Sequence, residues 1–140
     1  DLAYASDSSK FATSGVNFGL FCSTPMVALS RNVAAKQAME MLVSGDFIDA
    51  ARAVEIGLVN AALPEGELDA HLKKMAATIA SKSPYVLKLG KAAFYKQLNM
   101  PLDEAYKFTS GVMQENIASE DGQEGMHAFK EKRTPVWRGK

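Results

Sequence analysis

The stretch "SGDFIDAARAVEIGLVN", residues 44–60, decides how this chain folds. Gly45 follows a run of strong helix formers, and a helix of that composition should end there, because glycine adopts the left-handed conformation of a helix C-cap without a Cβ penalty. Asp49 is placed to begin a second helix and Gly57 to end it. The stretch therefore predicts two short helices around a loop, followed by a strand within "GLVNAAL", residues 57–63.

Composition limits the kind of protein this is. The chain has 140 residues, of which 47% are hydrophobic and 23% charged, as in a soluble globular domain. Sixteen basic residues balance sixteen acidic ones, so no overall field attracts nucleic acid or an anionic membrane. One cysteine forms no intrachain disulfide, and no apolar run approaches the roughly 20 residues of a spanning helix. We expect a reducing, aqueous compartment, no nucleic acid and no membrane.

The first ten residues look like an internal part of a longer chain. "DLAYASDSSK", residues 1–10, has neither the basic start and apolar core of a secretion signal nor the pattern of a transit peptide. Its first five residues predict a short strand, and the other strand candidates are residues 11–12 and 57–63. So few strands need a sheet that is very small or lies outside this chain. We expect a fragment of a larger domain; the alternative is an all-helical domain with one misassigned strand.

The second half of the chain is helical in pattern. Apolar residues recur at spacings of three and four from Leu68 to Ile79, which predicts a helix ending before Pro84. Further helices are expected from Pro84 to about residue 98, from Pro101 onward, and in "DGQEGMHAFKEKR", residues 121–133. In the last of these, an aspartate three residues before a glutamate is similar to a capping box.

Two motifs connect the chain to a known family. The stretch 44–60 is similar to the pattern T-G-x-x-I-x-A-x-x-A-x-x-x-G-L-V, and "EGMHAFKEKRTPVW", residues 124–137, is similar to E-G-x-x-A-F-x-E-K-R-x-P-x-F/W. Both patterns belong to the enoyl-CoA hydratase/isomerase family, also called the crotonase family, and their order resembles its C-terminal half. The resemblance runs over essentially all of the chain.

The resemblance implies an α/β fold of the crotonase-like (ClpP/crotonase) type. Members of this family have a spiral of β-β-α turns and then a helical region that packs trimers, often paired into hexamers. We therefore expect residues 1–63 to be the C-terminal end of the spiral core and residues 64–140 to be the helical oligomerisation region. The chain should be mostly helical, with two or three short strands.

The resemblance also implies a chemistry. Family members stabilise the enolate of a fatty acyl- or enoyl-CoA thioester with two backbone N–H groups that form an oxyanion hole. They use no metal and no cofactor, since CoA is part of the substrate. In hydratases two glutamates handle the water and the proton. The oxyanion hole and the first glutamate belong to segments that precede Asp1 in such proteins.

The second glutamate falls on a glycine. The family pattern F-x-x-P-E-x-x-x-G, laid on "FATSGVNFG", residues 11–19, puts Gly15 where the glutamate should be. Three interpretations remain open. Gly15 is a turn residue in a protein that binds acyl-CoA without turning it over, or another side chain does the chemistry, or the alignment is displaced. The nearby polar substitutes are Thr13, Ser14, Asn17 and Cys22.

The other titratable candidates have no visible constellation. Cys22 has no neighbouring base in the sequence that would lower its pKa, so a small packing residue is favoured over a nucleophile. His71 and His127 each lie in a predicted helix without partners of a catalytic or metal site, and surface or boundary positions are favoured for both.

The C-terminal segment, residues 126–140, is a candidate ligand site. Its basic side chains stand against a single acid, Glu131, and are Lys130, Lys132, Arg133, Arg138 and Lys140. The resemblance implies that Phe129 lies against the adenine of CoA and that Lys132 pairs with a phosphate. The alternative is that Phe129 is a core residue and the lysines form a solvated helix face.

Two functions therefore remain in view. One is an enzyme of fatty acid metabolism, a lyase or isomerase acting on a CoA thioester. The other is a catalytically inactive or weak acyl-CoA-binding relative that forms trimers. Either would be cytoplasmic or in the mitochondrial matrix.

Overall fold

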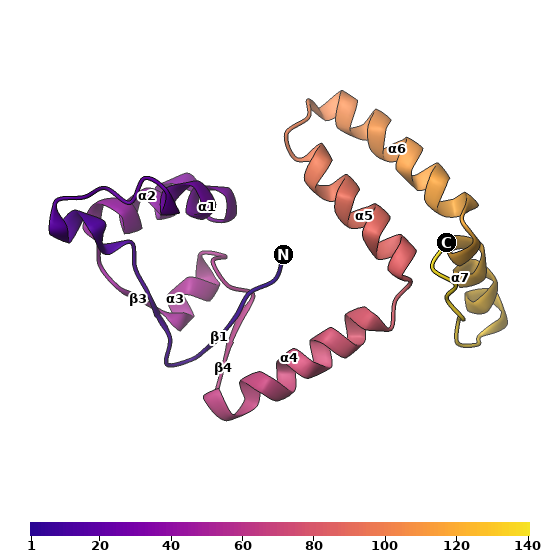
Figure 1. The fold of residues 1–140 in the computed structure, drawn as a ribbon, viewed down its shortest axis with the longest axis horizontal. Coiled ribbons are helices and arrows are strands. Elements are labelled where there is room, and N and C mark those ends of the chain that lie inside the picture. Colours follow the sequence, from indigo (N-terminus) through magenta and orange to yellow (C-terminus); the bar gives the residue numbers. More distant parts are fainter. The chain divides into compact units, whose positions relative to one another are not determined.

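The computed structural model describes residues 1–140. The chain divides into two compact units, residues 1–74 and residues 75–140 (Figure 1). The division falls inside helix α4 (Glu65–Ala80), so this helix begins in the first unit and ends in the second. The expected role of residues 64–140 in oligomerisation stays a prediction.

The first unit carries all of the strands. Its elements are β1 (Tyr4–Ser6), β2 (Lys10–Phe11), the 3₁₀ helix η1 (Ser14–Phe18), α1 (Pro25–Asn32), α2 (Ala35–Ser44), β3 (Ile48–Asp49), α3 (Ala50–Glu55) and β4 (Ala61–Leu63). β1 pairs in parallel with β4, and β2 pairs antiparallel with β3. Each sheet has two strands, which matches the very small sheet that was one of the two alternatives. β3 is an addition that the sequence did not predict, because two residues carry no periodicity.

The predicted helix ends around residues 44–60 are confirmed. Gly45 and Gly57 have φ angles of 67° and 78°, in the left-handed region where glycine is favoured. The side chain of Asp49 caps α3 by accepting a hydrogen bond from the backbone N–H of Arg52 at 2.8 Å. α2 packs against α1, and α3 packs against the short strands β2, β3 and β4.

Two clusters of buried apolar side chains hold the first unit together. One lies between α1 and α2 and contains Leu29, Val33, Ala38, Met41 and Leu42. The other joins β1 to α3 and contains Ala5, Ala53 and Val59. Phe11 and Ile48 pack against both, so the β2–β3 pair links the clusters.

The second unit is helical, as predicted. It contains the end of α4, then α5 (Pro84–Gln97), α6 (Leu102–Ala118) and α7 (Glu120–Glu131), and α5 and α6 lie side by side (Figure 1). Ser83 caps α5 by accepting from the backbone N–H of Val86 at 3.1 Å. None of the helices in the chain is both long and apolar enough to cross a membrane.

The capping box expected at the start of α7 is wrong. Ser119 caps this helix instead, with its hydroxyl accepting from the backbone N–H of Gly122 at 3.0 Å. Asp121 is buried, at 1% exposure, and accepts from the backbone N–H groups of Arg138 at 2.7 Å and Gly139 at 3.0 Å, and from the hydroxyl of Ser83. This carboxylate fastens the end of the chain to the helices.

Candidate functional site

Gly15 lies in η1, where the chain leaves no room for a side chain. A Cβ on Gly15 would lie 2.6 Å from the carbonyl oxygen of Leu20 and 2.7 Å from the Sγ of Cys22. The turn is closed by its own hydrogen bonds, from Leu20 N–H to the Gly15 oxygen at 3.0 Å and from Gly15 N–H to Cys22 Sγ at 3.3 Å. The glycine is therefore part of how this turn packs, and no carboxyl group projects from it.

The polar residues around Gly15 do not form a catalytic pair. Cys22 is half-buried, accepts the Gly15 N–H and packs against the α1–α2 cluster. The Asn17 amide donates to the Gly45 oxygen at 3.3 Å, which ties η1 to the end of α2. The hydroxyl of Thr13 is buried without a hydrogen-bond partner. No carboxylate, histidine or lysine is hydrogen bonded to any of these three side chains.

The two histidines have different surroundings. His71 packs on the ring of Tyr4, with ring centroids 4.9 Å apart, and its Nε2 is buried without a partner. His127 is exposed on α7. The chain contains no group of three or more His, Cys, Asp or Glu side chains placed to hold a metal ion.

Phe129 and Lys132 lie at the end of α7. Phe129 is 87% exposed, so the alternative that it is a core residue is wrong. Lys132 is the C-cap and has a φ of 55°, the single non-glycine residue of the chain with a positive φ. The backbone N–H of Lys132 donates to the Phe129 oxygen at 3.2 Å, and that of Arg133 donates to the Ala128 oxygen at 3.0 Å. These bonds hold the turn that presents the two side chains.

Most of the basic tail is neutralised within the chain. Arg133 pairs with Glu124 and Glu131, each at 2.6 Å. Arg138 and Lys140 both pair with Glu120, at 3.7 and 3.1 Å. Lys130 and Lys132 form no ion pair, so they are the cations of this segment that are available to an anionic ligand. The charge excess in the sequence overstates the field that a phosphate would meet.

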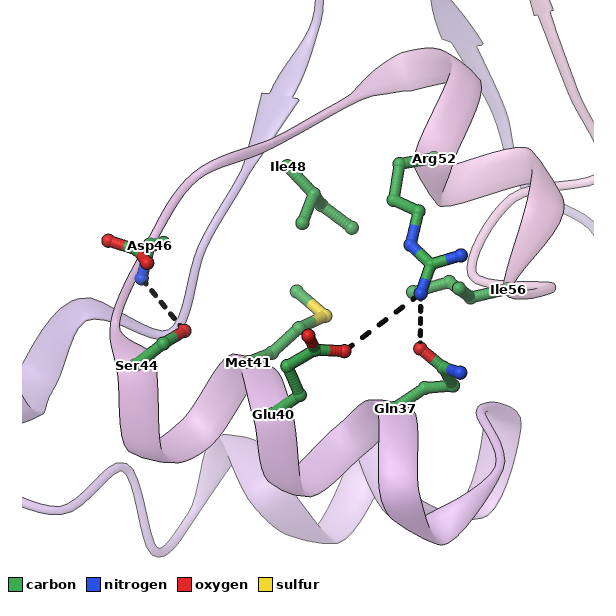
Figure 2. Close-up of a pocket in the computed structure, with 8 residues that line it drawn as sticks. All are labelled: Gln37, Glu40, Met41, Ser44, Asp46, Ile48, Arg52 and Ile56. Atoms are coloured by element: carbon green, nitrogen blue, oxygen red, sulfur yellow. Dashed lines mark hydrogen bonds and ion pairs between the residues drawn. The ribbon is translucent and has the colours of Figure 1, made fainter.

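A hollow of about 140 Å³ lies between α2 and α3. Figure 2 shows Arg52 reaching from α3 toward Gln37, to which it is hydrogen bonded, and Glu40, 3.9 Å away. Its guanidinium also pairs with Glu55 at 2.6 Å, and this hydrogen bond raises the pKa of Arg52. Because these partners take up its charge, Arg52 joins the two helices and leaves no free cation for a ligand.

Comparison with known proteins shows the family of this chain. Residues 1–140 match the family described as enoyl-CoA hydratase/isomerase. The chain belongs to this family. Its fold is the crotonase-like fold that the sequence predicted, represented by a mostly helical part with few short strands.

Its relatives include enoyl-CoA hydratase domain-containing protein 3, mitochondrial. The human protein is 54% identical over 137 residues, covering 98% of this chain and 45% of the relative. The mouse protein is 52% identical over 137 residues, again covering 98% of this chain, and 46% of the relative. The chain thus spans about half the length of these relatives, which fits the C-terminal half of the family. "FATSGVNFGLFCSTP", residues 11–25, and "GKAAFYKQL", residues 90–98, are the stretches that point to this subgroup.

Solved structures agree with this assignment. The crystal structure of human enoyl coenzyme A hydratase domain-containing protein 3 superimposes with a TM-score of 0.95 at 54% identity, covering 98% of this chain and 54% of that one. An enoyl-CoA hydratase from Mycobacterium smegmatis gives a TM-score of 0.94 at 44% identity, covering 98% and 53%.

Proposed function

We propose that the whole protein binds a fatty acyl- or enoyl-CoA thioester and acts through stabilisation of its enolate, with the second catalytic glutamate of the family replaced by Gly15. Membership of the enoyl-CoA hydratase/isomerase family supports the substrate class. The observation that carries the proposal is the closed turn at Gly15, in which a Cβ would lie 2.6 Å from a backbone oxygen. The change is therefore built into the backbone of η1 and is more than the loss of one side chain.

This replacement limits the chemistry. A positioned general acid or base contributes about 10²- to 10⁴-fold to the rate of a proton transfer. Glycine supplies no proton, and Cys22, its neighbour, acts as a hydrogen-bond acceptor and packing residue. Ordinary two-glutamate hydration should be slow in this protein, and so should isomerisation that uses a base at the same position.

A second function is favoured by the same observation. Because no acid or base is paired with the polar groups around Gly15, the protein is also suited to hold an acyl-CoA thioester with little or no turnover. On this proposal it is a catalytically inactive or weak, trimer-forming relative of the hydratases.

The end of α7 is the proposed contact for the nucleotide part of CoA. Phe129 offers an exposed aromatic face to the adenine, and Lys132 offers an unpaired ammonium to a phosphate. Lys132 takes the left-handed position at the end of α7 where glycine is favoured, and its side chain and that of the 87% exposed Phe129 are both available there.

Assembly into trimers or hexamers is proposed from the apolar side chains that the second unit exposes. They lie on α5, on α6 and just after the end of α5, and are Phe94, Leu98, Leu102, Tyr106, Met113 and Ile117. Large apolar patches of this kind usually mark an interaction surface. Since the relatives are named as mitochondrial, we propose the mitochondrion as the compartment and fatty acid metabolism as the setting.

The binding part of the proposal is tested by titration of the whole protein with butyryl-CoA, a saturated thioester that cannot be hydrated. We expect binding, and about tenfold weaker binding for Lys132→Ala, because a charge-assisted contact is lost. Lys88→Ala, which removes an exposed lysine of α5 outside the proposed site, is the control and should bind as the wild type does. No detectable binding by the wild type, or equal losses in the two variants, would contradict the proposed site.

A further inference from the structure

We propose that Glu124 is a positioning residue that acts through Arg133 to hold Phe129 and Lys132 in the orientation in which they meet CoA. This inference rests on the proposed function, because it concerns the same ligand site. It assigns a task to two charged residues, a glutamate that does not cap α7 as its spacing predicts and an arginine of the basic tail.

The geometry of the pair is specific. Glu124 lies on α7, and Arg133 lies nine positions later, beyond the turn that ends the helix. The guanidinium donates from Nη1 to Glu124 Oε1 at 2.6 Å and from Nη2 to Oε2 at 2.9 Å. Two parallel hydrogen bonds between planar groups fix direction as well as distance. The pair therefore sets the path that the chain takes after Lys132.

Glu124 also holds the chain at a second point. Its Oε1 accepts from the backbone N–H of Val136 at 2.8 Å. Arg133 donates to it, and this hydrogen bond and that of Val136 hold the pKa of Glu124 down at about 2. The carboxylate is thus ionised at neutral pH and closes a loop from residue 124 to residue 136. Glu131 adds an exposed bond to the Nε of Arg133, at 2.6 Å.

The residue inside this loop needs such support. Lys132 has a φ of 55°, and a left-handed backbone is unfavourable for a residue with a Cβ. The backbone bonds of the turn, the Glu124–Arg133 pair and the exposed Glu131–Arg133 bond hold it there. Phe129 and Lys132 themselves make no ion pair or side-chain hydrogen bond. The Glu124–Arg133 pair thus supports a strained turn. The side chains of Phe129 and Lys132 in this turn are free to contact a ligand.

The test is a double-mutant cycle in the whole protein, with two ligands. Glu124→Gln removes the ion pair but keeps an oxygen for the Val136 N–H. We expect it to weaken butyryl-CoA binding about tenfold, as expected for a misplaced charge-assisted contact. Binding of butyryl-pantetheine, which lacks the nucleotide, should not change. In a Lys132→Ala background, Glu124→Gln should have a smaller effect than in the wild type, because Phe129 is then the one residue left for it to position.

Two variants sharpen the result. Glu131→Gln removes the exposed partner of Arg133 and leaves the bidentate pair, so it should bind butyryl-CoA as the wild type does. Arg133→Lys keeps the charge and loses the fork, so it should behave like Glu124→Gln, and it replaces that variant if Glu124→Gln does not fold.

Three results would overturn the inference while leaving the proposed function standing. They are unchanged butyryl-CoA binding by both Glu124→Gln and Arg133→Lys, equal losses for the two ligands, and additive losses with Lys132→Ala. Failure of the wild type to bind butyryl-CoA would overturn the proposed function as well, so the two failures are told apart by the wild-type titration.

Discussion

At the scale of single residues, Gly15 is the residue that its local structure requires, whereas Lys132 is not the residue that its backbone conformation favours. Gly15 occupies a turn in which a Cβ would meet the Leu20 oxygen and the Cys22 sulfur, so glycine is what the local packing requires. Lys132 occupies a left-handed position in which glycine would be favoured, yet the chain has a long charged side chain there. A residue kept against its local preference is a better indication of function than one that agrees with it.

Replacement of Lys132 by glycine distinguishes a role of this residue in stability from a role in ligand binding. We expect Lys132→Gly to leave stability unchanged or raise it by about 1 kcal/mol, because glycine adopts the left-handed conformation without strain. Butyryl-CoA affinity should fall about tenfold with the loss of the ammonium group. Thermal denaturation and titration calorimetry measure the two effects. A less stable protein with unchanged affinity would show that Lys132 is structural.

Replacement of Gly15 by alanine tests the crowding of η1. We expect Gly15→Ala to lower the free energy of unfolding by about 1–3 kcal/mol, as overpacking does. Cys22→Ala in the same chain should recover only part of the loss, because the Leu20 carbonyl oxygen remains 2.6 Å from the new Cβ. Denaturant unfolding measures both. Gly15→Ala with wild-type stability would mean that the turn opens freely.

At the scale of elements, the residues that cap helices gave the most accurate predictions. Gly45, Gly57 and Asp49 predicted helix ends that the structure confirms, because capping is a local property of a few residues. The β2–β3 pair and the tasks of Asp121 and Glu124 could not be predicted. Each depends on a partner far along the chain, such as the backbone of residues 136–139.

The carboxylates of α7 make the second unit sensitive to acid. The pKa of Glu124 falls from its ordinary value of 4.5 to about 2 in the folded chain, chiefly through Arg133. Burial raises the pKa of Asp121, but its hydrogen bonds from Ser83, Arg138 and Gly139 outweigh this and leave it lowered. A carboxyl group with a lowered pKa stabilises the fold above its unfolded pKa, and this is lost as the pH falls through the folded pKa.

Acid unfolding of Glu124→Gln checks this sign. The variant should be less stable than the wild type at pH 7, and the difference should shrink between about pH 4.5 and about pH 2, where Glu124 becomes protonated. Asp121 is still present, so part of the pH dependence remains. Thermal unfolding over this range measures the difference, with Glu65→Gln on α4 as the control for removal of one exposed carboxylate. A difference that is constant with pH would contradict the account.

At the scale of the whole molecule, family and fold were predicted from motifs and the site only in part. The motifs at residues 44–60 and 124–137 led to the family, and the structure and its relatives agree. Composition suggested a tail with a large positive excess, whereas the folded chain pairs Arg133, Arg138 and Lys140 with glutamates. Charge counts do not show which side chains are already engaged.

The exposed apolar side chains of α5 and α6 predict an assembly of the whole protein. We expect analytical ultracentrifugation at micromolar concentration to give three or six times the mass of one chain, because burial of such surface is the main driving force of association. A monomer at this concentration would contradict the assembly and would leave these side chains in water.

The rate at which the whole protein hydrates crotonyl-CoA tests whether Gly15 replaces the second catalytic glutamate. The loss of the conjugated enoyl thioester absorbance is followed beside a family hydratase with glutamate at the position of Gly15. We expect a rate at least about 100-fold below that of the reference, because 100-fold is the lower end of what a general acid or base contributes. Because of the crowding at η1, Gly15→Glu should do no better than Gly15→Gln. A wild-type rate within about tenfold of the reference would contradict the account, since that is less than a general acid or base contributes.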